Sequence, residues 1–122
     1  MTWLRGRDAE LCLVSGGLGP THDDRTVALV ASVSGRELAL DAELERRIEE
    51  ISRGFAERLR RPYADFADGV RKQALVPAGS IVLGPAGTAP GLVVEADGCV
   101  VVVMPGPPGE LRRLWPAALE TA

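Results

Sequence analysis

The sequence predicts an α/β protein, and three patterns point to this class. Residues 10–15 form a short apolar run that enters the glycine-rich stretch Ser15-Gly16-Gly17, as a buried strand does before a tight loop. A helical pattern follows that loop. Residues 99–104 are apolar at every position, which favours a central strand. A strand, a glycine-rich loop and a helix in this order are typical of α/β folds, whose sites lie at the carboxyl ends of the strands.

The two helices in the first half of the chain are predicted from capping and periodicity. The first is expected to begin near Thr21 and stop at Gly35, because Thr21 and Asp24 have the spacing of a capping box with Asp in place of Glu or Gln. The second is expected over residues 41–60, with Asp41 as its N-cap. Its apolar residues recur every three or four positions. They are Leu44, Ile48, Ile51, Phe55 and Leu59.

The second half of the chain predicts mainly strands. Pro62 ends the long helix, and residues 63–71 are ambiguous between a loop and a short helical turn. Residues 81–83 are expected to form a short strand. Residues 92–95 and 99–104 are expected to form a hairpin around Ala96-Asp97-Gly98, since Asp-Gly favours a tight turn. A final helix is expected to start at Pro107 or Pro108 and to cover residues 110–119.

Composition limits the classes of function. A chain of 122 residues predicts one domain over residues 1–122. A net charge of -3, a pI of about 5.2 and 4% aromatic residues argue against nucleic acid as a partner. We interpret the basic run Arg58, Arg60 and Arg61 as a solvated helix end. Cys12 and Cys99 are expected to be buried, reduced thiols, and no segment has the pattern of a signal peptide or membrane span, so a cytoplasmic protein is expected.

The first motif with chemical meaning is the loop after the first strand. Its glycines, Gly16, Gly17 and Gly19, allow the backbone to approach a ligand, and the start of the following helix favours an anion. Asp23 and Asp24 would repel a bare phosphate. They fit the loop if a divalent cation lies between, because Mg²⁺ uses one or two carboxylates together with phosphate oxygens. The alternative is a turn whose Asp residues only cap the helix.

Three further segments have the same character. They are Lys72-Gln73-Ala74 with Val76-Pro77-Ala78-Gly79, then Gly87-Thr88-Ala89-Pro90-Gly91, and finally the run of residues 104–110, Met-Pro-Gly-Pro-Pro-Gly-Glu. Taken singly, each is consistent with turn punctuation. Lys72 is either a phosphate contact or a surface lysine, and Glu110 either supports the site or suits the helix dipole. His22 lies beside the carboxylates, and an exposed loop position is the favoured interpretation.

In this order the four segments resemble one family. The chain resembles the molybdenum-cofactor-biosynthesis-type (MoCF) domains at GGLGPTHDDRT, and the CinA branch of that family at KQALVP, GTAPG and PGPPGE, over about residues 8–114. The resemblance implies a three-layer α/β/α fold on a mainly parallel sheet. It also implies a small-molecule nucleotide or molybdopterin ligand, an essential Asp at Asp24, and self-association into a homo-oligomer.

The CinA branch is similar to enzymes that hydrolyse ADP-ribose to AMP and ribose 5-phosphate with a divalent metal. By this resemblance, Asp24 with Asp23 would hold Mg²⁺ and act in catalysis. The ligand and its phosphates would contact a larger set of residues: Ser15, Gly16, Gly17, Gly19, Lys72, Gly87, Thr88, Pro105 and Gly106. Backbone N–H groups of Gly17 and Gly19 would stabilise the added negative charge.

The chain departs from the family pattern at its start. A complete domain begins with a strand and two further motifs, one acidic, well before the glycine loop. Here only 15 residues precede Gly16, so we expect the first strands of the complete domain to be missing. Two alternatives to an active hydrolase therefore stay open: a non-catalytic molybdopterin- or nucleotide-binding domain, and an inactive truncated fragment.

Overall fold

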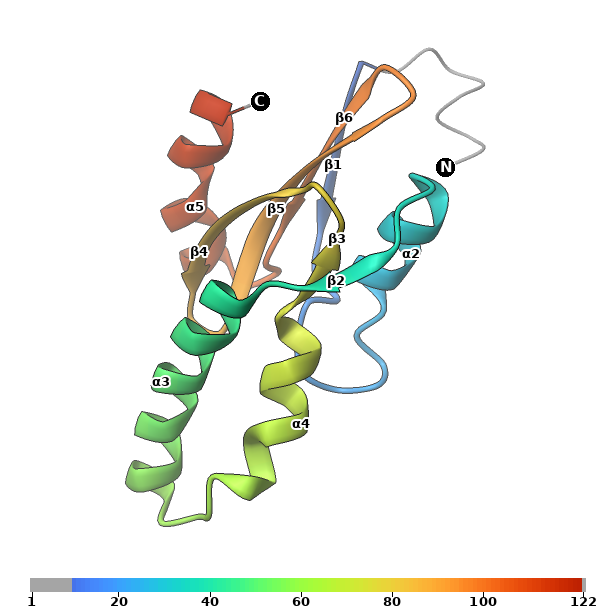
Figure 1. Cartoon of the computed structure of the whole chain (residues 1–122). Helices are drawn as coiled ribbons and strands as arrows, with labels where there is room; N and C mark the ends of the chain where they lie inside the picture. Colours follow the sequence, from blue (N-terminus) through green and yellow to red (C-terminus); the bar gives the residue numbers. More distant parts are fainter. Residues whose placement is uncertain (1–9, 122) are drawn as a thin grey trace.

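A computed structural model of the protein describes residues 10–121 (Figure 1). The main sheet has four strands in the order β1-β6-β5-β4, and a separate antiparallel pair joins β2 to β3. The strands are β1 (Leu11–Ser15), β2 (Leu38–Leu40), β3 (Leu75–Pro77), β4 (Ile81–Ala86), β5 (Ala89–Ala96) and β6 (Cys99–Met104). The helices are α2 (Thr26–Val33), α3 (Ala42–Leu59), α4 (Ala64–Gln73) and α5 (Pro108–Thr121).

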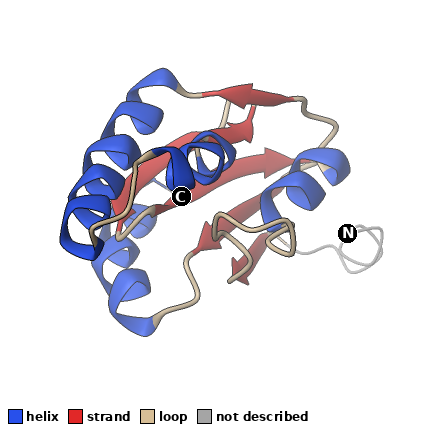
Figure 2. Ribbon diagram, turned by 90° about the horizontal axis from the view of Figure 1, so that it is seen from below, coloured by secondary structure: helices blue, strands red, loops and turns tan. Residues whose placement is uncertain are grey.

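Two apolar cores separate the molecule into three layers. One core joins alternate residues of β5 and β6, such as Leu92 and Val101, to Val30 of α2, Ile48 of α3 and Val70 of α4. On the opposite face, α5 packs its buried residues against β4, β5 and β6. They are Leu114 and Ala118. Figure 2 shows the helices distributed around the sheet in this way. The α/β class and the layered arrangement are therefore confirmed.

The sheet is mixed, so the expectation of a mainly parallel sheet is wrong. Only β1 and β6 run parallel, whereas β5 pairs antiparallel with both β6 and β4. The cause is local. A two-residue turn at Asp97 and Gly98, both with positive φ, joins β5 to β6, and such a turn can join only antiparallel strands. The predicted hairpin and the predicted central position of residues 100–103 are confirmed.

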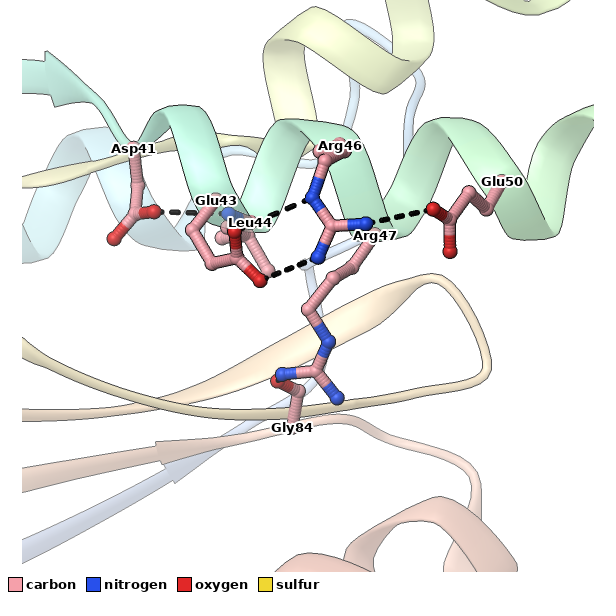
Figure 3. Close-up of polar contacts among 7 residues, drawn as sticks. All are labelled: Asp41, Glu43, Leu44, Arg46, Arg47, Glu50 and Gly84. Atoms are coloured by element: carbon pink, nitrogen blue, oxygen red, sulfur yellow. Dashed lines mark hydrogen bonds and ion pairs between the residues drawn. The ribbon is translucent and has the colours of Figure 1, made fainter.

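Helices α3 and α4 pack against each other. Strand β2, which leads into α3, pairs with strand β3, which follows α4. The β2–β3 ladder and the hydrogen bond from Asp41 N–H to the Ala74 carbonyl (3.0 Å) join the start of α3 to the end of α4. The Asp41 side chain accepts a hydrogen bond from Leu44 N–H at 2.9 Å, which confirms it as the N-cap (Figure 3). Arg47 donates to the Gly84 carbonyl and so links α3 to β4 (Figure 3).

Three further expectations need correction. The first helix begins at Thr26 rather than near Thr21, because residues 21–24 form a separate turn. The uncertain segment 63–71 is mostly helix, within α4. Strand β1 exists as predicted but is not buried: it lies at the edge of the sheet, and Leu11 and Leu13 are 53% and 56% exposed.

The apolar stripe of the long helix is buried only at its start. Leu44 and Ile48 are buried, whereas Phe55 and Leu59 are exposed. Cys99 is buried and Cys12 half-buried, and both are free thiols. Burial raises the pKa of the Cys99 thiol, and Cys12 adds to this shift. No helix in the described range is long and apolar enough to cross a bilayer.

Candidate functional site

The glycine loop lies at the carboxyl ends of the two parallel strands. Gly16 N–H donates to the Met104 carbonyl at 3.0 Å, so the loop starts where β1 and β6 both end. Gly16 and Gly17 have φ of +86° and +70°, a conformation that favours glycine. Thr26, the first residue of α2, donates its hydroxyl to the Gly16 carbonyl at 2.7 Å. A Cβ on Gly17 would lie 2.1 Å from that hydroxyl oxygen, so the closure of the loop requires glycine there.

Asp24 organises the far side of the loop. Its Oδ2 accepts hydrogen bonds from the Thr21 hydroxyl at 2.7 Å and from Thr21 N–H at 3.1 Å. The Thr21 hydroxyl is the main cause of a lowered pKa of the Asp24 carboxyl, and the backbone of Thr21 and Gly19 and the charge of Lys72 lower it further, against a smaller opposing effect of burial. Asp24 is therefore a stable carboxylate at neutral pH. A Cβ on Gly19 would lie 2.6 Å from its Oδ2, so Gly19 lets the carboxylate fold back onto the loop.

The last turn of α4 holds the loop from the other side. Lys72 Nζ donates to the Asp24 carbonyl at 2.6 Å. Gln73 is 7% exposed, and its amide donates to the Leu18 carbonyl at 3.1 Å and to the Thr88 hydroxyl at 3.2 Å. Gln73 thus joins the glycine loop to the loop between β4 and β5. Both side chains fix the backbone of the site from one helix end.

The two remaining loops complete the site. Gly106 lies against Gly16, since a Cβ built on it would be 3.4 Å from the Gly16 Cα. A Cβ on Gly87 would lie 2.4 Å from a carboxylate oxygen of Glu110, so this glycine makes room for an acid from the start of α5. Each approach joins two segments that are far apart in the sequence.

These segments enclose one cavity of about 280 Å³. Its walls come from all four sequence motifs. The lining residues are Gly16, Gly17, Leu18, Gly19, Asp24, Gln73, Thr88, Ala89, Pro105, Gly106, Pro107 and Glu110. The cavity combines glycine backbone, a helix start, two carboxylates, one amide and one hydroxyl, and it can therefore offer both donors and acceptors to a polar ligand.

Comparison with known proteins agrees with the motifs. A family model described as "Probable molybdopterin binding domain" (MoCF) matches residues 2–122. The chain belongs to this family.

Curated relatives of this MoCF domain are named CinA-like proteins. One from Mycolicibacterium vanbaalenii is 54% identical over 99% of the chain, and one from Mycobacterium tuberculosis is 47% identical over all of it. The chain spans 29% of the length of each of these relatives. A solved structure titled as the protein CinA with unknown function, from Thermoplasma acidophilum, matches with a TM-score of 0.75 at 31% identity and covers 94% of this chain and 63% of that one.

The structure brings most of the predicted ligand-binding residues of the MoCF domain together. Gly16, Gly17, Gly19, Asp24 and Thr88 line the cavity, as do Pro105 and Gly106. Gly87 contributes indirectly, by admitting Glu110.

Three predicted residues lie elsewhere. Ser15 faces a separate apolar cavity beside α5. Lys72 is neither a free surface lysine nor part of the 280 Å³ cavity, because its ammonium group binds the loop backbone from behind. Asp23 is directed to solvent, with 88% of its side chain exposed. Its Oδ1 lies 3.4 Å from Nε2 of His22, whose side chain is 95% exposed.

Two cavity residues stand outside the predicted ligand set. Gln73 lies in the Lys72-Gln73-Ala74 segment, and no role was predicted for its amide from the sequence. Glu110 ends the glycine- and proline-rich segment after β6, and its role was left open. Both line the cavity. Glu110 reaches the cavity because Gly87, far from it in sequence, leaves room for its carboxylate. The residues next to Glu110 in the sequence do not indicate this contact.

The donor set fits a divalent cation in part. Asp24 and Glu110 are the two carboxylates of the cavity, and Mg²⁺ accepts one or two carboxylates together with phosphate oxygens of a ligand. Asp23 does not share the site. Over residues 10–121 there is no group of three or more His, Cys, Asp or Glu side chains that could hold a metal by themselves. A cation here would need ligand oxygens to complete its coordination. The metal and the homo-oligomer remain predictions.

Proposed function

We propose that this MoCF domain binds a phosphate-bearing nucleotide in the glycine-loop cavity and, with Mg²⁺, hydrolyses the pyrophosphate of ADP-ribose to AMP and ribose 5-phosphate. The single observation that supports this most is the convergence of three separated loops and the end of helix α4 on one cavity with Asp24 at its wall. The sequence similarity to CinA-like relatives extends over almost the whole chain, which supports a common class of ligand.

The loop suits phosphate because of its backbone. Gly16 N–H is bonded to the Met104 carbonyl, whereas the positive-φ Gly17 lines the cavity and can offer its N–H to a ligand; the start of α2, after the loop, adds the positive end of a helix dipole. The Asp24 and Glu110 carboxylates that line the cavity oppose a bare phosphate, and Mg²⁺ bound between them and the ligand would offset their charge. Lys72 lies behind the loop and contributes positive charge to the same region.

The reaction adds one water to the pyrophosphate. The water oxygen bonds to one phosphorus, the bridging P–O bond breaks, and the bridging oxygen leaves with the other phosphate. The water protons end on the two products or in solvent. When bound, Mg²⁺ would neutralise phosphate charge and favour deprotonation of the attacking water. Asp24 would bind the cation that contacts the pyrophosphate, and Gly17 N–H would donate to the phosphate oxygen on which negative charge increases. Gln73 would position Thr88 and the glycine loop through its two hydrogen bonds.

A non-catalytic binding domain is the second candidate, and one observation favours it. Asp23 points away from the cavity, so the paired carboxylates that would make the strongest metal site are not brought together. Binding of a nucleotide or pterin phosphate needs the loop backbone and an offset of the carboxylate charge, whereas hydrolysis also needs a cation placed to activate water. This candidate predicts retention of the ligand without turnover.

The test measures AMP release from ADP-ribose by the purified chain with Mg²⁺, for the wild type, Asp24→Asn and Asp23→Asn. We expect AMP release by the wild type, loss of it in Asp24→Asn, and retention of most of it in Asp23→Asn, because only Asp24 lines the cavity. Equal loss in both variants would mean that both carboxylates hold the cation. Binding of ADP-ribose without AMP release would support the non-catalytic candidate, and absence of both would refute the proposal.

A further inference from the structure

A second cavity adjoins the glycine-loop cavity. It has a volume of about 490 Å³ and lies between the loop at Pro20 and Thr21, helix α3 and helix α4. Gln73 and Thr88, joined by their 3.2 Å hydrogen bond, line both cavities. Helices α3 and α4 run side by side next to this loop (Figure 1). Both volumes fall near or within the range of small-molecule sites, so one ligand can extend across the shared wall.

The second cavity has the chemistry of a ring-binding site. The chain contains two phenylalanines, Phe55 and Phe66, and both line this cavity. Phe55 is 38% exposed, so it does not serve as a core residue. Arginines hold the rings: the Arg58 guanidinium lies 4.7 Å from the Phe55 centroid and that of Arg61 lies 5.6 Å from the Phe66 centroid. Aromatic rings that line a cavity are suited to stack on a flat heterocycle.

The acids of the cavity are hydrogen-bond acceptors. Asp65 and Asp68 both line it. Asp65 is already paired with Arg61 at 3.2 Å. Within residues 10–121, no side chain or backbone group donates a hydrogen bond to the Asp68 carboxylate, so it is available to accept from a ring N–H or amino group. The feature that distinguishes this cavity from the glycine-loop cavity is its pair of aromatic rings, since each cavity is lined by two carboxylates.

Gly69 shapes the wall between the loop and α4. A Cβ at Gly69 would lie 2.6 Å from the Pro20 Cβ, so this glycine lets the loop pack directly on the helix. The loop that holds Asp24 therefore also forms one side of the second cavity. The contact between Gly69 and Pro20 therefore positions the loop for both cavities.

We propose that the cavity between α3, α4 and residues 20–21 is the subsite for the flat, N–H-bearing ring of the ligand, a purine base or a pterin, whose phosphates occupy the glycine loop. Phe55 and Phe66 stack on the ring, and Asp68 accepts a hydrogen bond from it. This inference rests on the proposed function, because it takes the phosphates to bind at the glycine loop. The glycine backbone in one cavity and the aromatic rings in the other set the direction in which the ligand binds.

The experiment compares ADP-ribose, which carries an adenine ring and a pyrophosphate, with ribose 5-phosphate, which carries one phosphate and no ring. The dissociation constants of ADP-ribose and of ribose 5-phosphate are measured by calorimetry for the full chain, with Ca²⁺ in place of Mg²⁺ to keep ADP-ribose intact. The variants are Phe55→Leu, Phe66→Leu and Asp68→Ala. Leu59→Ala serves as the matched control, since Leu59 is exposed on α3 and does not line the cavity. Thermal melts establish that each variant is folded.

Loss of one stacking contact is expected to weaken ADP-ribose binding about tenfold or more in each Phe variant, while ribose 5-phosphate binding stays unchanged. Asp68→Ala should weaken ADP-ribose binding alone, and Leu59→Ala should weaken neither. A pterin and adenosine, added as competitors, show which ring is preferred. Unchanged ADP-ribose binding in both Phe variants, or equal weakening of both probes, overturns the ring subsite and leaves the proposed function standing. Absence of binding of both probes to the wild type overturns both.

Discussion

Two neighbouring glycines test how the loop is closed. Gly16 and Gly17 both have positive φ, so alanine at either position is strained by about 1–2 kcal/mol. They differ in their surroundings. A Cβ at Gly16 meets nothing within 4 Å, whereas a Cβ at Gly17 would lie 2.1 Å from Thr26 Oγ1. Gly17→Ala must therefore also displace the hydroxyl that donates to the Gly16 carbonyl, a bond whose loss costs about 1 kcal/mol.

We expect Gly17→Ala to lower the free energy of unfolding by about 2–3 kcal/mol and Gly16→Ala by about 1–2 kcal/mol. Chemical denaturation at 25 °C measures both. In a Thr26→Ala background the 2.1 Å contact disappears, so the extra cost of Gly17→Ala should shrink, which a double-mutant cycle detects. Equal costs at the two glycines, or an extra cost that persists without the Thr26 hydroxyl, would refute this account of loop closure.

Three other predictions concern the core, the α3 cap and the pH dependence of stability. Leu92→Ala should cost about 2–5 kcal/mol in chemical denaturation because Leu92 is 0% exposed, whereas Leu29→Ala, 59% exposed, should stay within about 0.5 kcal/mol; similar losses would contradict the assigned core. Asp41→Ala should cost about 1 kcal/mol by removal of the α3 cap, and an unchanged midpoint would speak against that cap. The Asp24 pKa is lowered in the folded state from its ordinary value of 3.8, so the ionised carboxylate stabilises the fold above that value and this stabilisation is lost as the pH falls through the folded pKa. The free energy of unfolding of the wild type should therefore fall more than that of Asp24→Asn below about pH 4. Parallel curves of unfolding free energy against pH for the two proteins would exclude this linkage.

Elements with strong local signals were predicted well. The N-cap at Asp41, the turn at Asp97-Gly98 and the apolar run of β6 all agree with the structure. In each case a few adjacent residues determine the outcome, through a side-chain cap, a positive φ, or burial on both faces of a strand. The site motifs were also found, because glycine- and proline-rich segments after strands are visible in sequence.

Features set by tertiary contacts were not predicted. The spacing of Thr21 and Asp24 is that of a cap, but their hydrogen bonds close a turn ahead of α2 instead. The two adjacent acids diverge, with Asp24 folded onto Gly19 and Asp23 exposed, and sequence adjacency cannot separate them. The apolar character of residues 11–14 predicts a strand, while its position at the sheet edge depends on which strands pair with it.

The central claim is that three distant loops and the end of α4 form one site for a phosphate-bearing ligand. Thermal melts of the chain with ADP-ribose and Mg²⁺ test it most directly, because binding to the folded state raises the midpoint. Ligand at about 100 times its dissociation constant should add about 2.7 kcal/mol, and each kcal/mol should raise the midpoint by about 4 °C for a domain near this size. We predict a rise of about 10 °C in the wild type and little or none in Asp24→Ala. A wild-type midpoint that does not move at millimolar ligand would contradict the claim.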